Sequence, residues 1–348
     1  MRPLAPLSAP IDPSAALSRI AWLLERRRES TYRVEAFRRA AHAAAQLDTA
    51  DLRTRSEAGT LTAIAGIGKT TAAVIVDALA GRVPGYLSRL QDEESPYPAG
   101  PATDLVAAAR GDCHAHTDAS DGGAPLDEMA EAATAFGLEW LAITDHSPRL
   151  TIANGLSAER LSGQIDAIGR YNDDPGTTIR LLRGIEVDIL DDGSLDQTDE
   201  MLEQLDIVTA SVHSALRMEH DAMTRRLVAA VSNPRVDVLG HCTGRRVLSG
   251  RGHRPPSTFD ARAVFEACAA NGTAVEINSR PERVDPPDEL IDIAIELGCL
   301  FAIDSDAHAP GQLEFTVLGA RRAYDHGIDP DRIITTWPVD RLLKWASG

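Results

Sequence analysis

The sequence predicts two domains, a small all-α domain followed by an α/β domain arranged as an α/β barrel or a relative of one. Three observations support this prediction. The chain has 348 residues, which suits two domains better than one. Helical apolar periodicity dominates the first 90 residues, and short apolar runs alternate with helical segments from residue 111 onward. We therefore expect a helical domain at 1–90, a linker at 91–110 and an α/β domain at 111–348.

The first domain is expected to begin with two amphipathic helices. Residues 15–28 place Leu17, Ile20 and Leu24 on one face, and residues 32–47 repeat the pattern with Val34 and Phe37. Arginines crowd the polar faces of both segments. Charge alone leaves two interpretations open, a solvated face or a surface for an anionic ligand.

Residues 61–79 contain a Gly66-Ile67-Gly68-Lys69-Thr70 segment. A nucleotide-binding P-loop is excluded because Ala63 stands where that motif needs its first glycine, and no strand precedes it. The segment resembles a helix-hairpin-helix DNA-binding motif, in which Gly66, Gly68, Lys69 and Thr70 would hold a phosphate through backbone N–H groups at a helix N-terminus. The alternative is a helical hairpin whose glycines serve packing alone.

Residues 91–110 are rich in Pro, Gly and acidic residues, which is typical of a linker. After them, alternating strands and helices predict parallel strands joined by crossover helices. The expected strands, about seven in all, are 113–117, 138–144, 179–189, 205–212, 236–240, 273–277 and 300–303. The expected helices are 127–136, 158–168, 222–231, 261–270 and 288–297.

Ionisable residues stand at the end of every expected strand. They include Asp112, His114, His116, Asp121, Asp145, His146, Glu186, Asp188, His213, His241, Glu276, Asp306 and His308. In barrels of this type the carboxyl ends of the strands meet at one rim, where active sites form. Alternate residues of a strand face the same side, so His114 with His116, and Asp306 with His308, can each bind one metal ion. Imidazole and carboxylate ligands suit Zn²⁺, Mn²⁺ or Fe²⁺. A lone strand histidine is usually a core residue, but that explanation does not fit the whole set.

The ordered motifs HAH…SDG, ITDHS, GIEVDI, SVHS, LGHxTGR, EINS and DSDAH resemble those of the PHP (polymerase and histidinol phosphatase) superfamily over about residues 111–340. The resemblance implies a distorted seven-stranded barrel that holds up to three metal ions. It implies one ion at His114, His116, Glu186 and Asp306, a second at Glu186, His213 and His241, and a third at Asp121, His146 and His308. Asp121 stands where some relatives have His. We expect Mn²⁺ to support activity, with Zn²⁺ and Fe²⁺ as alternatives.

Within the superfamily, the chain is similar to the PHP region of bacterial family X DNA polymerases, whose N-terminal domain resembles residues 15–90 in YRVEAFRRAA and AGIGKTTA. Those enzymes carry a polymerase palm between the two parts, and here only the short linker stands there. We therefore predict no polymerase activity. Relatives with lyase activity use a lysine on the helix after the glycine turn; Val74 occupies that position, and Lys69 lies in the turn.

The sequence predicts metal-assisted hydrolysis of a phosphate ester, with Arg149, Arg245 and Arg280 as candidate phosphate-binding residues because each follows a motif. A surface ion pair is an equal alternative for each arginine. The first functional hypothesis is a DNA nuclease of the 3′→5′ exonuclease, 3′-phosphodiesterase or abasic-site endonuclease type. The second is a small-molecule phosphatase of the histidinol-phosphate type, and the third is a non-catalytic DNA-binding module.

The charge distribution favours the first hypothesis. The net charge of −17 argues against a nucleic-acid partner at first sight. However, residues 1–90 carry 13 Lys and Arg against 8 Asp and Glu, whereas the rest carries 22 against 44. DNA is therefore the expected partner of the basic domain, with a separate repair polymerase or ligase as a further candidate. No secretory signal or membrane span is recognisable, and four scattered cysteines indicate buried thiols, so a cytoplasmic location is expected.

Overall fold

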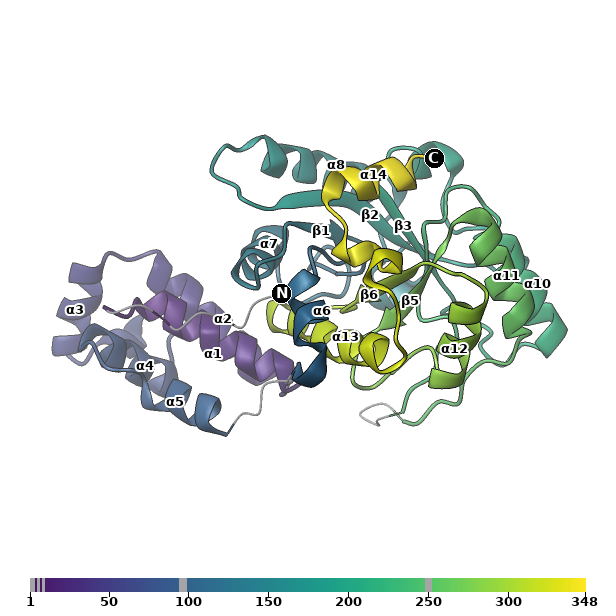
Figure 1. Ribbon diagram of the computed structural model, residues 1–348. Helices are drawn as coiled ribbons and strands as arrows, with labels where there is room; N and C mark the ends of the chain where they lie inside the picture. The colour runs from purple at the N-terminus through teal and green to yellow at the C-terminus, as the bar shows by residue number, and fades with distance from the viewer. Residues whose placement is uncertain (1–3, 5–6, 8–9, 94–98, 248–251) are drawn as a thin grey trace. The chain divides into compact units, whose positions relative to one another are not determined.

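The computed structural model describes residues 4, 7, 10–93, 99–247 and 252–348, and they form two compact units. The first unit is helical (Figure 1). Its helices are α1 (Pro13–Arg26), α2 (Thr31–Ala45), α3 (Thr49–Glu57), α4 (Lys69–Leu79) and α5 (Gly85–Asp92). The segments expected at 15–28 and 32–47 are thus confirmed as helices within about two residues at each end.

Helix α1 begins where the sequence supplies a cap. The Asp12 carboxylate accepts a hydrogen bond from the Ala15 amide at 2.9 Å, and Pro13 occupies the first helical turn. The apolar face packs on α2, and a buried ion pair joins the two helices, with Arg38 Nη2 2.6 Å from Glu25 Oε1. The helical unit therefore has its own core, made by residues between Ile11 and Leu90.

The glycine turn joins a short 3₁₀ segment, Leu61–Ala63, to α4. One helix was expected on each side of the glycine turn. The helix expected before it is reduced to the 3₁₀ segment, because α3 ends earlier, at Glu57. Gly66 adopts φ +89°, a left-handed conformation that glycine adopts without strain. Gly68 is the N-cap of α4, and its N–H donates to Thr71 Oγ1 at 2.9 Å.

The second unit is built on one parallel sheet whose strands are hydrogen-bonded in sequence order. They are β1 (Trp140–Ile143), β2 (Arg180–Asp188), β3 (Ile207–Ser211), β4 (Val238–Leu239), β5 (Ala274–Asn278) and β6 (Phe301–Asp304). Each lies inside or within one residue of an expected strand. Buried parallel strands read as continuous apolar runs, and for this reason the sequence located them.

The seventh expected strand, at 113–117, is not a regular strand. Ala115 makes single parallel bridges to Ile143 of β1 and to Ala307 just beyond β6, so the segment lies between the two edges of a curled six-stranded sheet. Side chains take the place of ladder partners here. The amides of Cys113, Ala115 and Thr117 donate to Asp304 Oδ1, Thr144 Oγ1 and Asp145 Oδ1 at 2.8, 3.0 and 2.8 Å. The expectation of a seven-stranded barrel is corrected to this half-barrel.

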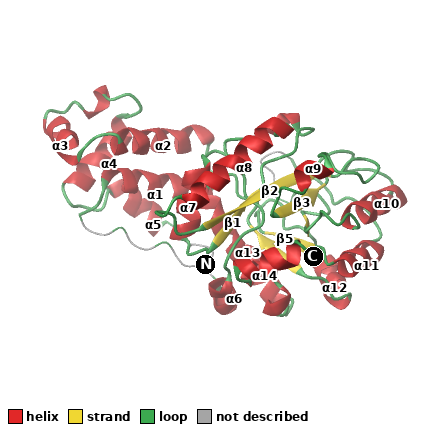
Figure 2. Cartoon of the chain, turned by 90° about the horizontal axis from the view of Figure 1, so that it is seen from above, coloured by secondary structure: helices red, strands yellow, loops and turns green. Residues whose placement is uncertain are grey.

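Helices flank the sheet (Figure 2). They are α7 (Leu126–Ala135), α8 (Ala158–Asp173), α9 (Asp199–Leu202), α10 (His220–Val231), α11 (Ala261–Asn271), α12 (Asp288–Glu296), α13 (Thr316–Asp325) and α14 (Val339–Ala346). α8 packs on β2, α11 on β5 and α13 on β6. The five predicted helices are present. Cys113, Cys242, Cys268 and Cys299 are buried free thiols, as expected.

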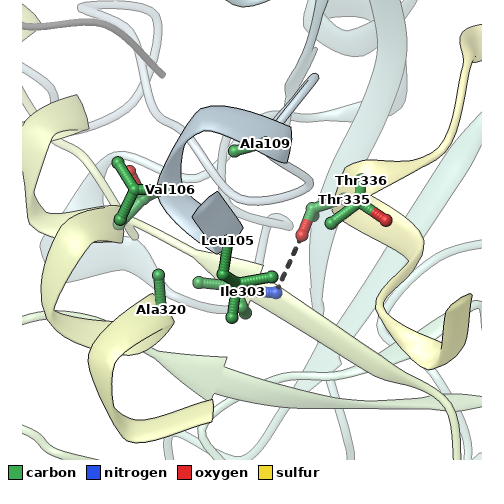
Figure 3. A pocket seen from close by; sticks show the side chains of 8 residues that line it. Leu105, Val106, Ala109, Ile303, Ala320, Thr335 and Thr336 are labelled. Atoms are coloured by element: carbon green, nitrogen blue, oxygen red, sulfur yellow. Dashed lines mark hydrogen bonds between the residues drawn. The ribbon is translucent and has the colours of Figure 1, made fainter. Parts of the chain in front are cut away.

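The segment predicted as a linker is only partly a loop. Residues 94–98 lie outside the described residues, but a 3₁₀ turn (Gly100–Ala102) leads into helix α6 (Thr103–Ala108). Leu105 of α6 is buried near Ile303 of β6 and Ala320 of α13 (Figure 3). The second unit therefore uses part of the expected linker to cover its core. No helix in the described ranges is long and apolar enough to cross a membrane.

Candidate metal centre

The structure brings together all nine residues that the resemblance implies as metal ligands. The nine residues lie in the opening segment or at the carboxyl ends of the strands. His114, His116 and Asp121 belong to the opening segment and its turn, His146 follows β1, Glu186 lies in β2, His213 follows β3, His241 follows β4, and Asp306 and His308 follow β6. Parallel strands in sequence order bring these positions to the same rim. The centre is therefore a direct product of the strand topology.

Glu186 occupies the middle of the cluster. Its carboxylate oxygens lie 2.8 to 3.5 Å from ring nitrogens of five histidines: His114 Nε2, His116 Nε2, His146 Nδ1, His213 Nε2 and His241 Nε2. Its exposed fraction is 1%. A buried carboxylate between five imidazoles has the position required of a bridging ligand.

Two further carboxylates complete the cluster on either side. Asp306 Oδ1 lies 3.6 Å from His116 Nε2, and Asp121 Oδ1 lies 3.5 Å from His146 Nε2 and 3.4 Å from His308 Nε2. Asp306 is buried, whereas the Asp121 side chain is 36% exposed. The Asp121 side of the cluster is therefore the more open to solvent.

Potential ligand atoms form four overlapping groups, with all atoms of a group within 4.8 Å of one another. The groups are His116–Asp121–His146–His308, His114–His241–Asp306, His114–His116–Glu186 and His146–Glu186–His213. They differ from the three sets implied by the resemblance, because His116 also lies near the third set and His241 groups with His114. The sharing of His114, His116, His146 and Glu186 between groups is typical of a multinuclear site.

Buried ring nitrogens without hydrogen-bond partners test whether the cluster fits a metal. Among the described residues they are His114 Nε2, His116 Nδ1 and Nε2, His146 Nδ1, His213 Nδ1 and Nε2, and His241 Nδ1. A polar atom buried without a partner costs about 1–3 kcal/mol, so this concentration would be unfavourable in a purely structural core. Glu276 Oε1 lies 2.6 Å from His114 Nδ1 and orients Nε2 toward Glu186, as in carboxylate–histidine–metal arrangements. The residues therefore fit divalent metal ions.

The charges within the cluster favour anionic carboxylates. Burial raises the pKa of the Glu186 carboxyl, but the charges of His114 and His213 outweigh it and hold this pKa well below its usual range. Burial likewise raises the pKa of Asp306, and Arg283 with His114 reverses the shift and lowers it well below normal. Both carboxylates are consequently ionised at neutral pH, which is the form that binds metal.

Several acidic residues support the ligands without belonging to the groups. Asp112 Oδ1 accepts from the His114 amide at 3.0 Å, and burial raises the pKa of its carboxyl to about 6. Asp145 accepts from the Thr117 amide at 2.8 Å and from the Thr117 hydroxyl at 2.6 Å. Both residues stand next to predicted ligands in the sequence, which marked them as candidate site residues. Only the structure shows that they hold the backbone of the opening segment.

Of the three predicted phosphate-binding arginines, only Arg280 lies in the cluster. Its Nη1 donates to the Asp306 carbonyl at 2.7 Å and lies 2.8 Å from His308 Nδ1. Arg245 Nε donates to the Val284 carbonyl at 2.9 Å and so stabilises a loop, and the Arg149 side chain is exposed. The guanidinium groups of Arg245 and Arg149 form no hydrogen bond or ion pair with the ligand groups among the described residues, and their role in phosphate binding stays a prediction.

Sequence reasoning missed Arg283. This side chain is 9% exposed, and its Nε donates to Asp306 Oδ2 at 3.0 Å. The adjacent Val284 has φ +51°, and the preceding loop returns to β5 through a backbone hydrogen bond from Asn278 to Asp285 at 2.8 Å. Nothing in the local sequence marks this return. The candidate site therefore contains two arginines, Arg280 and Arg283, on one loop.

In the helical unit, the four predicted DNA-binding residues are on the surface. Gly66, Gly68, Lys69 and Thr70 are all exposed, while Ile67 between the glycines is buried. Lys69 and Thr70 are the first residues of α4, where amides lack intrahelical acceptors. Val74 lies in α4 and is 2% exposed. The turn therefore lies on the surface of the helical unit, and the binding of DNA by these four residues stays a prediction.

Family models match both units. A PHP domain model matches residues 112–280, and a helix-hairpin-helix domain model matches residues 12–83. The chain is 40% identical over 214 residues to the DNA polymerase/3′-5′ exonuclease PolX of Bacillus subtilis. That match covers 62% of this chain but only 37% of the length of PolX.

Shorter relatives match over most of their length. A probable phosphatase of Caldanaerobacter subterraneus subsp. tengcongensis is 30% identical over 247 residues, which is 67% of this chain and 89% of that protein. The crystal structure of histidinol phosphate phosphatase from Lactococcus lactis subsp. lactis, complexed with zinc, L-histidinol and phosphate, covers 64% of this chain and 95% of its own. Its sequence identity to this chain is 17% and the TM-score is 0.44. From the family models and the relatives, the chain belongs to the PHP family of phosphoesterases and carries a helix-hairpin-helix domain ahead of its PHP domain.

Proposed function

We propose that this chain is a metal-dependent nuclease that processes 3′ ends of DNA, as a 3′→5′ exonuclease, 3′-phosphodiesterase or abasic-site endonuclease. The observation that carries the proposal is the coexistence of a nine-residue ligand cluster with a basic helix-hairpin-helix domain in one chain. The similarity to PolX, named as a polymerase and 3′-5′ exonuclease, supports it. The helix-hairpin-helix domain is the feature that favours DNA as the substrate, because the ligand cluster alone would suit other phosphate esters as well.

The chain's own residues would prepare the site for a phosphodiester. Glu276 holds His114 in one orientation, and Asp145 fixes the backbone beside His116. Arg283 and Arg280 both form ion pairs with Asp306, and Arg280 also pairs with Glu282. Of the two, Arg280 lies next to His308, where its cation would offset charge on a phosphoryl group. When bound, the divalent ions would polarise the phosphoryl oxygens and lower the pKa of a water molecule that attacks phosphorus.

We propose Mn²⁺ as the ion that supports activity, with Zn²⁺ or Fe²⁺ as alternatives. The ligand set of imidazoles and carboxylates, without thiolates, suits all three ions. The assignment can be tested by stripping the protein of metal, reloading it with each ion separately and measuring the shortening of a 5′-labelled duplex with a recessed 3′ end. Nuclease activity restored by none of these ions would contradict the proposal.

Hydrolysis of a small phosphate ester is the second candidate function. The relatives that match over about nine-tenths of their length are described as probable phosphatases. Histidinol phosphate serves as the comparison substrate in the same assay. Release of phosphate from it without any shortening of DNA would favour the phosphatase and contradict the nuclease.

Polymerisation and lyase chemistry are not part of the proposal. Residues 91–110 are too few to contain a palm with paired aspartates, and the buried Val74 stands where lyase relatives have a lysine. We propose DNA as the partner of the helical unit, bound through its backbone and therefore by structure rather than sequence. A separate repair polymerase or ligase would have to act on the processed end.

A further inference from the structure

A cavity of about 510 Å³ is lined by residues that follow β3 and by residues 254–258, and it has no part in the ligand cluster. Its lining includes Leu216, Arg217, Met218, Arg254, Pro255 and Pro256. Cavities of roughly 300–1,000 Å³ are the usual size for small-molecule or cofactor-sized ligands. The lining is part apolar and part cationic, which defines the chemistry of an occupant.

Both walls of the cavity are anchored to segments that carry predicted ligands. One wall, residues 215–218, begins two positions after His213. The other wall is tied to the segment after His241, since the Ser257 amide donates to the Thr243 carbonyl at 2.9 Å and Arg254 Nε donates to the Gly244 carbonyl at 2.6 Å. Ser257 Oγ also donates to the Leu216 carbonyl at 2.8 Å and joins the two walls. The two walls of the cavity are therefore held to the segments that leave the sheet at His213 and His241.

The charge of the cavity is opposite to that of its surroundings. The eight lining residues include two arginines and no acidic residue, although residues 91–348 carry 44 Asp and Glu against 22 Lys and Arg. The Arg217 side chain makes no hydrogen bond or ion pair with any residue in the described ranges. Burial, together with the nearby charges of Arg283 and Arg246, lowers the pKa of Arg254 to about 10, so cations are concentrated here. Such a cavity attracts an anion that also has an apolar face.

We propose that this cavity binds the nucleotide next to the scissile phosphodiester of a DNA strand. Arg217 and Arg254 contact the phosphate of that nucleotide, and Leu216, Met218 and the two prolines pack against its base. The inference rests on the proposed nuclease function and names the substrate subsite that this function requires. Apolar contacts with the face of a base carry little sequence information, so the subsite accepts any of the four bases.

Equilibrium binding tests the subsite without turnover. Full-length protein is titrated calorimetrically, in the presence of EDTA, with the 5′-phosphorylated thymidine dinucleotide pTpT. Arg217→Ala and Arg254→Ala are each expected to weaken binding about 10- to 100-fold, because each removes a charge-assisted hydrogen bond. Arg321→Ala makes the same change of charge on the exposed face of α13 and should leave binding within twofold. Equal affinity of all four proteins, or no binding by the wild type, overturns the proposal.

Kinetics separate the subsite from the reacting centre. The metal-loaded proteins hydrolyse an oligonucleotide, which fills the subsite, and bis(p-nitrophenyl) phosphate, which contains no nucleoside and leaves the subsite empty. We expect kcat/KM for the oligonucleotide to fall at least about tenfold in Arg217→Ala, with the small ester unchanged within twofold. Equal loss on both substrates would assign the arginine to the reacting centre or to folding and overturn the inference. A wild type that hydrolyses only the small ester would contradict the nuclease function, while the dinucleotide titration still decides the subsite.

Discussion

Glu276 illustrates how strongly a residue outside the ligand groups can affect the centre. Its Oε1 lies 2.6 Å from His114 Nδ1, and its Oε2 accepts a hydrogen bond from Asn278 Nδ2 at 3.2 Å. The residue is fully buried. In Glu276→Gln the new amide group would face one of these donors, and His114 would lose its anionic partner. We expect metal affinity to fall about 10- to 100-fold, measured by competition with a chromogenic chelator. Glu139→Gln, on the surface, is the matched control, and equal affinity in both variants would contradict the role.

The paired ligands His114 and His116 have a stricter role. Both rings are buried, and both lie within 3.5 Å of Glu186. His114→Ala combined with His116→Ala should remove bound metal and reduce hydrolysis to below about 1% of the wild-type rate, since these residues would hold an ion on which the proposed hydrolysis depends. Metal content by mass spectrometry and turnover of a chromogenic ester are the measurements. Retained activity at normal metal content would show that the cluster is not the active site.

Asp237 makes the free energy of unfolding depend on pH, and this dependence does not involve metal. Burial raises the pKa of this carboxyl from its ordinary value of 3.8 to about 8, and the hydrogen bond from the Val208 amide at 2.7 Å opposes the shift only in part. Between these values the folded protein holds a proton that the unfolded chain has released, so the free energy of unfolding falls as the pH rises. Its contribution is complete below about pH 4 and lost by about pH 8.

Asp237→Asn should therefore flatten the pH profile of stability. Asparagine keeps a carbonyl acceptor for the Val208 amide but does not titrate. We expect the decline in the free energy of unfolding between pH 5 and pH 8 to shrink by about 3 kcal/mol, because one bound proton contributes about 1.4 kcal/mol per pH unit over most of this range, and urea denaturation measures it. An unchanged slope would show that Asp237 is ionised in the folded protein throughout this range.

Among the secondary-structure elements, strands were predicted better than the segments between them. Buried runs such as 179–189 and 205–212 have few interpretations, because parallel strands need apolar residues on both faces. Helix α6 escaped prediction because its six residues follow a proline-rich segment and only Leu105 is deeply buried. The opening segment was mistaken for a strand because its alternation is real but its partners are side chains. The nine residues of the cluster were predicted through motifs, whereas the position of Arg283 depends on the three-dimensional return of its loop.

The hairpin turn provides a test with a paired control. A Cβ on Gly66 would lie 3.2 Å from the Arg39 carbonyl oxygen, at φ +89°, whereas a Cβ on Gly68 would meet nothing within 4 Å. Gly66→Ala should lower the stability of the helical unit by about 1–2 kcal/mol, and Gly68→Ala should cost less. Thermal unfolding followed by circular dichroism measures both. A larger loss in Gly68→Ala would contradict the conformational argument.

Considered as one chain, the protein couples a basic helical unit to an acidic catalytic unit, each with its own core. The core of the first comprises residues between Ile11 and Leu90, and those of the second begin at Leu105 and Cys113. Removal of residues 1–90 should consequently leave the sheet and the ligand cluster folded. The truncated protein would, however, lack the exposed glycine turn and the basic surface that we propose to contact the DNA backbone.

This separation predicts that the two activities respond differently to truncation and salt. In a variant without residues 1–90, DNA cleavage should fall about tenfold or more, while turnover of thymidine 5′-(p-nitrophenyl phosphate) stays within twofold of the full-length protein. Raising the salt concentration should weaken DNA cleavage by the full-length protein far more than ester turnover, since counterions compete for the 13 Lys and Arg of the helical unit. Circular dichroism first establishes that the truncated chain is folded. Equal loss of both activities in a folded variant would show that the helical unit supports the catalytic unit structurally and does not serve DNA.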